Sequence, residues 1–335
     1  MTAERKLTYR DAIREGMALE MDRDPSVFIM GEDLSGGLGG KIRDKGGGVF
    51  RVTRGLLPRF GEERVRDTPI SESAFVGAGV GAAITGMRPI VEIMHIDFMG
   101  VCMDQIMNQA AKIRYMFGGQ IQVPMVIRTT IGAGCSAAAQ HSQNLYSMLV
   151  HIPGLKVVLP ATPYDAKGLL IAAIRDNDPV IYSENKMLYG EEGPVPEEEY
   201  LVPLGKGRVV REGKDVTVVA LSRMLYFALE AAKFLEKRGI SLEVIDPRTL
   251  FPLDEEMLIN SVTKTGRLVI MDEDTPRCSM ASEIAAIIAE NCFDALDAPI
   301  RRINAPHTPV PFSPELEKYY VPDGERLISV VEKMF

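Results

Sequence analysis

The stretch DTPISESAFVGAGVGAA, which runs from Asp67 to Ala83, places one carboxylate at the junction between an extended segment and a helix rich in small residues. Pro69 disfavours a helical conformation for the residue before it, so the helix is predicted to begin at about Glu72. Ser71 stands where a side chain can cap the free N–H groups of a first helical turn. The rest of the chain is organised around this carboxylate.

The interior of the predicted helix contains three glycines, Gly77, Gly79 and Gly81. Each costs roughly 1 kcal/mol of helix propensity relative to alanine. Packing must offset this cost, because a glycine lets another backbone or ring approach closely. We therefore expect a partner helix or a cofactor ring against this helix.

Glu72 itself has two interpretations. An acid in the first turn is favoured by the helix dipole, and the spacing alone favours this structural role. A carboxylate pressed against a glycine-rich, apolar helix is also suited to holding or sharing a proton. The local sequence leaves both open.

Length and composition predict an enzyme or enzyme subunit of two domains. The chain has 335 residues, 46% of them hydrophobic, with a formal net charge of −8. No basic cluster points to nucleic acid or an anionic membrane as a partner, and no apolar run approaches the length of a membrane span. The charged start of the chain lacks the apolar core of a secretory signal, so the expected location is cytoplasmic.

The cysteines have irregular spacing and form no CxxC pair; they are Cys102, Cys135, Cys278 and Cys292. This pattern predicts neither a zinc site nor a disulfide framework, and buried thiols are expected.

Alternating strand and helix patterns fill the first part of the chain. Thr8 can cap a helix that runs to about Met21, and apolar spacing predicts one continuous helix from Met99 to Phe117, ended by Gly118 and Gly119. The segments expected as strands are VFIMGED, RPIVEIMHI, VPMVIRTT, LKVVLPAT and PVIYSEN. Together with a helix from about Tyr164 to Arg175 they form a βαβ rhythm that ends near Tyr189.

Residues 190–207 are rich in Pro, Gly and Glu and are predicted to be a linker. The alternation then restarts as a second, smaller α/β domain with mainly parallel strands. Its predicted strands are DVTVVALS, SLEVID, RLVIMDED and PIRRIN, and its predicted helices cover residues 224–237, 254–262 and 280–291.

Several polar positions have both a structural and a functional interpretation. The glycine-rich run from Ser35 to Gly48 is expected to be a surface loop, and His95 a half-buried, hydrogen-bonded histidine. Asp272 to Asp274 is expected to be a solvated turn rather than a metal site, and His307 to lie in an extended surface segment. His141 follows a loop of small residues, where a cap and a chemical role are equally consistent with the sequence.

The motifs DTPISE, FMGVCMDQIMNQAAKIRYMFGG, AAAQHSQ, HIPGLKVV and APHTPVPFSP resemble those of the β subunits of thiamine-diphosphate-dependent 2-oxo acid dehydrogenase E1 components. The resemblance covers essentially the whole chain. The segment Gly31 to Gly48 and the run PRCSMA are most similar to the acetoin dehydrogenase branch, followed by the pyruvate branch. The resemblance implies two doubly wound α/β domains: a transketolase-like pyrimidine-binding domain in residues 1–189 and a transketolase C-terminal-like domain in residues 208–335.

The resemblance also assigns roles to particular residues. Glu72 matches the glutamate that shares a proton with N1′ of the cofactor aminopyrimidine, and Phe98, Ile70 and Met94 match positions in the wall of that site. His141 matches a histidine near the reacting carbon and the incoming lipoyl group. The family also has a potassium site of backbone carbonyls, whose matching residues here are Val123, Met125, Val126, Ala173, Asp176 and Asp178.

The chain lacks a GDG motif followed by a downstream asparagine pair, the pattern that holds Mg²⁺ and the diphosphate in this superfamily. The resemblance therefore implies half a site, completed by an α subunit that holds most of the Mg²⁺ ligands, in an α2β2 heterotetramer. A lipoyl-bearing E2 acyltransferase is the expected further partner, docked on the second domain near Asp272 and Phe335.

The predicted activity is that of an oxidoreductase subunit that cleaves acetoin and transfers the acetyl unit to the lipoyl group. The alternative within the family is a β subunit for pyruvate or another 2-oxo acid. Two further classes are a self-sufficient, transketolase-like thiamine enzyme, which the missing metal motif disfavours, and a purely structural subunit, which would remain active without Glu72.

Overall fold

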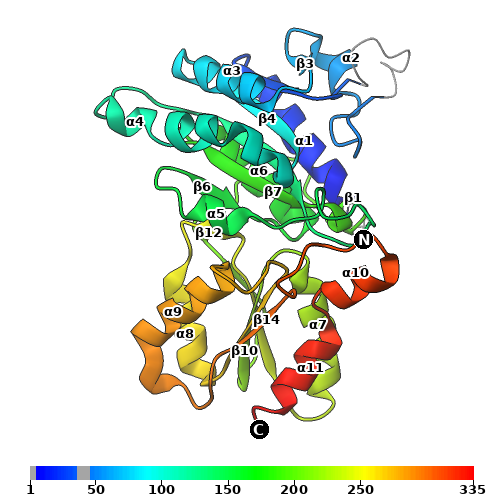
Figure 1. Cartoon of the computed structure of the whole chain (residues 1–335), viewed down its shortest axis with the longest axis vertical. Coiled ribbons are helices and arrows are strands. Elements are labelled where there is room, and N and C mark those ends of the chain that lie inside the picture. The colour runs from blue at the N-terminus through cyan, green and yellow to red at the C-terminus, as the bar shows by residue number, and fades with distance from the viewer. Residues whose placement is uncertain (1–4, 36–45) are drawn as a thin grey trace. The chain divides into compact units, whose positions relative to one another are not determined.

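The computed structural model describes residues 5–35 and 46–335. The chain forms two compact units (Figure 1). The first comprises the chain up to Ile131 together with Met148–Leu204, and the second comprises Gly132–Ser147 and Gly205–Phe335. Most of the run predicted as a glycine-rich surface loop lies outside the described residues.

Parallel strands form the centre of the first unit. The strands up to the end of this unit are β1 (Lys6–Thr8), β2 (Val27–Gly31), β3 (Val65–Asp67), β4 (Arg88–His95), β5 (Val126–Ile131), β6 (Lys156–Val158), β7 (Val180–Asn185) and β8 (Glu192–Pro194). The order within the sheet is β6-β7-β5-β4-β2-β3, with parallel neighbours throughout. The central strands β5 and β7 are buried along their whole length, although each includes polar residues, among them Arg128 and Glu184. β8 falls in the predicted linker and pairs antiparallel with β1.

Helices alternate with these strands. The α-helices are α1 (Tyr9–Arg23), α2 (Leu56–Phe60), α3 (Glu72–Ile84), α4 (Ile113–Met116), α5 (Tyr146–Val150) and α6 (Pro163–Arg175). Three further helical segments are η2 (Ile96–Cys102), η3 (Gln105–Ala110) and η4 (Lys186–Leu188). Thr8 caps α1 as predicted, because its hydroxyl accepts a hydrogen bond from the Asp11 N–H at 3.1 Å.

The prediction of one continuous helix from Met99 to Phe117 is wrong. The segment consists of a 3₁₀ helix (η2), a π-helix (η3) and a single turn of α-helix (α4). The π-helix begins at Gln105, which lies so close to α3 that a Cβ on Gly77 would be 2.9 Å from the Gln105 Oε1. Packing against α3 accounts for the departure from the local helical spacing. Gly118 and Gly119 end the segment with positive φ, as expected.

The second unit contains the predicted smaller sheet. The strands in this unit are β9 (Arg208–Arg211), β10 (Val216–Ala220), β11 (Leu242–Asp246), β12 (Thr249–Phe251), β13 (Leu268–Asp272) and β14 (Arg301–Asn304). Its helices are α7 (Met224–Glu236), α8 (Glu255–Thr265), α9 (Met280–Cys292), η5 (Phe293–Ala295), α10 (Pro314–Tyr320) and α11 (Gly324–Glu332). In the sheet order β14-β13-β10-β11-β9 only β9 runs antiparallel to its neighbour, which confirms the mainly parallel prediction.

The cysteines are only partly buried as a group, contrary to the expectation of buried thiols. Cys102 and Cys292 are buried, but Cys135 and Cys278 are exposed, so buried thiols were the wrong expectation for half of the cysteines. Within residues 5–35 and 46–335, none of the helices has the length and apolar character needed to cross a bilayer.

Candidate functional site

Glu72 is the first residue of α3 and is only 8% exposed. The helix begins where the sequence predicts, but the predicted cap is wrong. Ser71 occupies the N-cap position, yet its hydroxyl donates to the Pro69 carbonyl at 3.2 Å and caps no helical N–H. The negative charge of Glu72 at the helix N-terminus offsets part of this loss.

The glycines of α3 permit close packing, as expected. A Cβ on Gly79 would lie 2.6 Å from Val91 Cγ2 of β4, so only glycine fits there without movement of the strand. Gly81 faces open space. The close neighbours of α3 among the described residues include β4, η2 and η3 of the same chain.

Glu32, which directly follows β2, is the partner of Glu72. The two carboxyl groups are hydrogen-bonded, and burial together with the negative charge of Glu72 raises the pKa of Glu32 to about 7. A hydrogen bond between two carboxyl groups requires a proton on one of them. Glu32 can therefore hold a proton beside Glu72 near neutral pH.

Sequence reasoning did not identify Glu32. The available signal was an acid at the carboxyl end of a buried parallel strand, the edge where α/β sheets bind ligands. A separation of 40 positions from Glu72 conceals the pairing in the sequence.

The apolar segment η2 closes another side of Glu72. Burial and the negative charge of Glu72 raise the pKa of the Cys102 thiol to about 12. The Ser73 hydroxyl, on the next residue of α3, donates to the Val101 carbonyl at 2.6 Å. Glu72 thus lies between an acid on one side and an apolar helical segment with a neutral thiol on the other.

Phe98 and Met94, the predicted wall residues on η2 and β4, are half-buried in the first unit. The Phe98 ring packs edge-to-face on the His95 ring, with 5.7 Å between centroids. The Thr130 hydroxyl donates to the Met94 carbonyl at 2.6 Å and therefore accepts from His95 Nδ1 at 3.0 Å. His95 is hydrogen-bonded, as predicted, but it is buried rather than half-buried, and it supports Phe98. Ile70 is 84% exposed.

Arg128 is a large cation buried in the first unit, at 1% exposure. Its guanidinium donates to Glu92 at 2.6 Å and to both oxygens of Glu184, at 2.7 and 2.9 Å. These carboxylates occupy the fork that could otherwise bind a substrate carboxylate.

His141 belongs to the second unit, on the loop that follows β5, and is half-buried. The loop has an unusual backbone: Gly132, Gly134, Ser136 and Ala138 all have positive φ. The His141 N–H donates to the Ala138 carbonyl at 3.4 Å, and the Gly132 N–H donates to the Gln143 carbonyl at 3.4 Å. These bonds close the loop around the histidine. His141 and Glu72 thus lie in different units.

Carboxylates from distant parts of the second unit hold this loop. Glu317 of α10 accepts from the N–H groups of Gly134 at 2.5 Å and Ser136 at 2.9 Å. Glu273 accepts from the Ala133 N–H at 2.7 Å, and Arg223 donates to the Ala133 carbonyl at 3.0 Å. Sequence reasoning did not identify these partners.

The expectation that Asp272 to Asp274 forms a solvated turn is wrong. Asp272 is fully buried and Glu273 is 3% exposed. Asp272 accepts from the Tyr146 hydroxyl and from the Ala281 N–H. Burial, followed by the negative charge of Asp272, raises the pKa of Asp274 to about 7. The described residues contain no cluster of three or more potential metal ligands, here or elsewhere.

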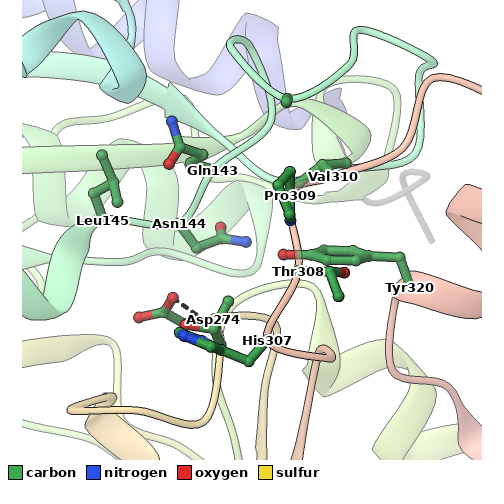
Figure 2. A pocket seen from close by; sticks show the side chains of 11 residues that line it. Gln143, Asn144, Leu145, Asp274, His307, Thr308, Pro309, Val310 and Tyr320 are labelled. Carbon is green, nitrogen blue, oxygen red and sulfur yellow. Dashed lines mark hydrogen bonds between the residues drawn. The ribbon is translucent and has the colours of Figure 1, made fainter.

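A cavity of about 340 Å³ lies beside the His141 loop within the second unit (Figure 2). It is lined by residues just after His141, among them Gln143 and Asn144, and by Asp274 and Tyr320. His307 also lines this cavity and is exposed, as predicted, but its segment bends rather than running extended, because the Thr308 N–H donates to the Pro306 carbonyl at 2.8 Å. Figure 2 shows Tyr320 reaching from α10 with its hydroxyl toward the side where Asn144 lies.

The residues matched to a potassium site gather where β5 begins and α6 ends. The Val123 N–H donates to the Asn177 carbonyl at 3.2 Å, and the Met125 carbonyl accepts from Val180 at 3.0 Å. The side chains of Asp176 and Asp178 bind Lys156 Nζ at 2.6 and 3.3 Å. The carbonyl site stays a prediction.

Comparison with protein families matches residues 5–192 to the transketolase pyrimidine-binding domain and residues 205–327 to the transketolase C-terminal domain. The chain is 55% identical to the acetoin:2,6-dichlorophenolindophenol oxidoreductase subunit beta of Bacillus subtilis, over 97% of this chain and 96% of that protein. The chain belongs to the family of E1 dehydrogenase β subunits. The same subunit of Cupriavidus necator is 56% identical, over 98% of this chain and 97% of that protein.

Other members of this family are less similar. The 2-oxoisovalerate dehydrogenase subunit beta of Bacillus subtilis is 46% identical, with 98% of each chain covered. Among solved structures, a split-gene transketolase in an inactive β4 tetramer has a TM-score of 0.79 at 23% identity, over 98% of each chain, and thus shares the fold. These matches confirm the α/β fold with two transketolase-like domains.

Proposed function

We propose that this chain is the β subunit of a thiamine-diphosphate-dependent enzyme that cleaves acetoin and passes the acetyl unit to the lipoyl group of a partner acyltransferase. The observation that carries the proposal is the identity of 55–56% to two acetoin oxidoreductase β subunits, against 46% for the 2-oxoisovalerate dehydrogenase subunit. Pyruvate or another 2-oxo acid as substrate is the alternative.

The overall reaction balances without a further oxidant. The bond between the carbonyl and carbinol carbons of acetoin breaks, and one half of the molecule leaves as acetaldehyde. The remaining two-carbon unit is oxidised to an acetyl group while the lipoyl disulfide is reduced. The products are one thioester and one thiol.

The residues around Glu72 suit the aminopyrimidine of thiamine diphosphate, which supplies the carbon nucleophile when bound. A ring nitrogen that must gain and lose a proton is well served by Glu72 and Glu32, because Glu32 can hold a proton beside Glu72 near neutral pH. Phe98, Met94 and Ile70 would provide apolar surface against the ring and keep water from the carboxyl pair. The diphosphate and Mg²⁺ fall mainly to an α subunit in an α2β2 assembly, since the sequence lacks the metal motif.

His141 is the proposed proton-transfer group near the acetyl unit. An imidazole has an ordinary pKa close to neutrality and can both accept and donate a proton during transfer. In this proposal, a potassium ion at the predicted carbonyl site, where β5 begins and α6 ends, would have a structural role.

Acetoin carries no carboxylate, so its site needs no arginine. Arg128 supports this reading because its guanidinium is fully engaged by Glu92 and Glu184. A 2-oxo acid would gain from a free cation near its carboxylate.

Docking of the acyltransferase on the second unit remains part of the proposal, but its surface must differ from the one expected around Asp272. Asp272 and Glu273 are buried, so they cannot present charge to a basic partner. Phe335 is 63% exposed, and the Arg267 guanidinium lies 4.5 Å from the centre of its ring. A comparison of acyltransferase binding to the wild-type chain and to the Phe335→Ala variant tests this docking on the second unit.

The test of the proposed function is a comparison of substrates on the enzyme reconstituted with its α subunit. With an artificial dye as acceptor, kcat/KM for acetoin should exceed that for pyruvate by more than tenfold, a difference of about 1.4 kcal/mol in transition-state stabilisation. A preference for pyruvate or a branched 2-oxo acid would select the alternative.

A further inference from the structure

The His141 loop is held in a backbone conformation that it would not adopt alone. Ser136 and Ala138 are non-glycine residues with φ of 55° and 62°. Such left-handed conformations are unfavourable for residues with a Cβ and persist only where surrounding contacts impose them. A contact with another part of the unit must therefore impose the left-handed turn at Ser136 and Ala138.

Glu317 has the position and charge to do so. Its carboxylate is 3% exposed and accepts from two backbone N–H groups of the loop, those of Gly134 and Ser136. Hydrogen bonds to a buried carboxylate are stronger than those between neutral groups, because the charge is otherwise unsolvated. The two N–H groups flank Cys135 and must turn toward the same carboxylate, which favours the strained turn.

The backbone of Glu317 is itself fixed. Its N–H donates to the Ser313 carbonyl at 2.9 Å, and its carbonyl accepts from Val321 at 3.1 Å. The carboxylate therefore extends from a rigid helical turn, which makes it a reliable reference point for the loop.

The path from this carboxylate to the histidine is short. Ser136 is held directly, Ala138 continues the left-handed turn, and the Ala138 carbonyl accepts from the N–H of His141. Release of the first contact would let the turn relax and move the imidazole.

We propose that Glu317 is a positioning residue for the reaction, acting through the loop from Gly132 to Gln143 to fix His141 for transfer of the acyl group. This inference rests on the proposed role of His141. Glu317 contacts neither substrate nor cofactor in this account; it sets the geometry of a group that does.

The test uses the α/β enzyme with Glu317→Gln and the matched control Glu315→Gln. Glu315 lies on the same helix but is exposed and pairs with Lys318 at 2.9 Å. The amide in Glu317→Gln places an N–H₂ group against backbone N–H donors, so the loop should shift. A displacement of about 1 Å can cost up to ~100-fold in rate, so we expect kcat for transfer to a lipoyl domain to fall by about 10- to 100-fold, with KM for acetoin unchanged. The control should match the wild type.

Two further measurements separate positioning from general loss of structure. In the His141→Ala background, Glu317→Gln should cause no additional loss of transfer, because the group that it positions is already gone. Hydrogen exchange of the peptide spanning the loop should quicken in Glu317→Gln and not in Glu315→Gln. If Glu317→Gln does not assemble, Glu317→Asp keeps the charge with a shorter reach and should show an intermediate loss of kcat.

Some outcomes would overturn the inference. Equal rates in Glu317→Gln and Glu315→Gln, or an equal additional loss in the His141→Ala background, would refute positioning by Glu317 while leaving the role of His141 intact. Normal transfer by His141→Ala alone would remove the proposed role of the histidine and this inference with it.

Discussion

The helix that carries Glu72 and the loop that carries His141 are held in place by contacts of different range. α3 packs against β4 and η3, whose contacting residues Val91 and Gln105 lie within about 30 positions of its glycines. The His141 loop depends on Arg223, Glu273 and Glu317, which follow it by roughly 90 to 180 positions. One candidate catalytic group is therefore positioned by neighbouring sequence, and the other by the distant half of the chain.

The two regions should therefore differ in which substitutions they tolerate. Around Glu72 the sensitive positions are glycines that a neighbouring side chain approaches closely, because steric fit places the helix. Around His141 they are buried charged groups, because hydrogen bonds hold a loop without regular structure.

The largest expected effect in the loop region is that of His141→Ala. Removal of the imidazole should lower the rate of acetyl transfer to a lipoyl domain by about 10²-fold, the usual contribution of one acid–base group. Single-turnover measurements on the α/β enzyme test this expectation. The control is His151→Ala, which removes an exposed imidazole from the first unit; equal transfer rates in the two variants would reduce His141 to a loop residue.

In the helix region, Gly79→Ala and Gly81→Ala form a matched pair. The new Cβ at position 79 would meet Val91 Cγ2 at 2.6 Å, whereas position 81 has open space. Overpacking at Gly79 should lower the free energy of unfolding by about 1–3 kcal/mol, and Gly81→Ala should raise it by up to about 1 kcal/mol. Thermal unfolding of the isolated β chain checks both signs; equal destabilisation would mean that close packing does not place α3.

The smallest effect is a pH dependence at Asp274, whose pKa is raised to about 7 by burial and by Asp272. The folded chain then binds a proton more readily than the unfolded chain, whose Asp keeps its ordinary pKa of about 3.9. The contribution to stability is complete below the ordinary value and is lost as the pH rises through 7.

Asp274→Asn removes this titration and should keep the acceptor for Ser147, which donates to Asp274 at 2.9 Å. We expect the stability of the variant to depend less on pH between about 4 and 7 than that of the wild type, so the variant should gain stability relative to the wild type as the pH rises from about 5 to about 8. Asp294→Asn, at an exposed position, is the control. Identical pH profiles for the wild type and Asp274→Asn would contradict the raised pKa.

Most of the fold could be predicted because apolar runs and caps are local signals. Pro69 and Glu72 mark the start of α3, and Thr8 marks the start of α1. The segment from Met99 was misassigned because its packing against α3 overrides its spacing.

The site was predictable only in part, for the same reason. Glu72 stands beside a recognisable helix start, but its acidic partner Glu32 lies 40 positions upstream. Asp272 to Asp274 looked like a surface turn because the sequence does not reveal that Tyr146 and Ser147 cover it. Pairings across such distances follow from the tertiary fold, which no local pattern encodes.

The central claim is that Glu72 handles the proton that activates the bound cofactor, and its most direct test is hydrogen–deuterium exchange at C2 of the thiazolium ring on the assembled enzyme. Glu72→Gln cannot share a proton with the ring nitrogen, so exchange should slow by about 10²-fold or more, turnover should nearly cease, and the bound cofactor should remain at wild-type occupancy. Glu63→Gln, at an exposed side chain paired with Arg66, should exchange like the wild type. Exchange and turnover of Glu72→Gln within severalfold of the wild type would contradict the claim.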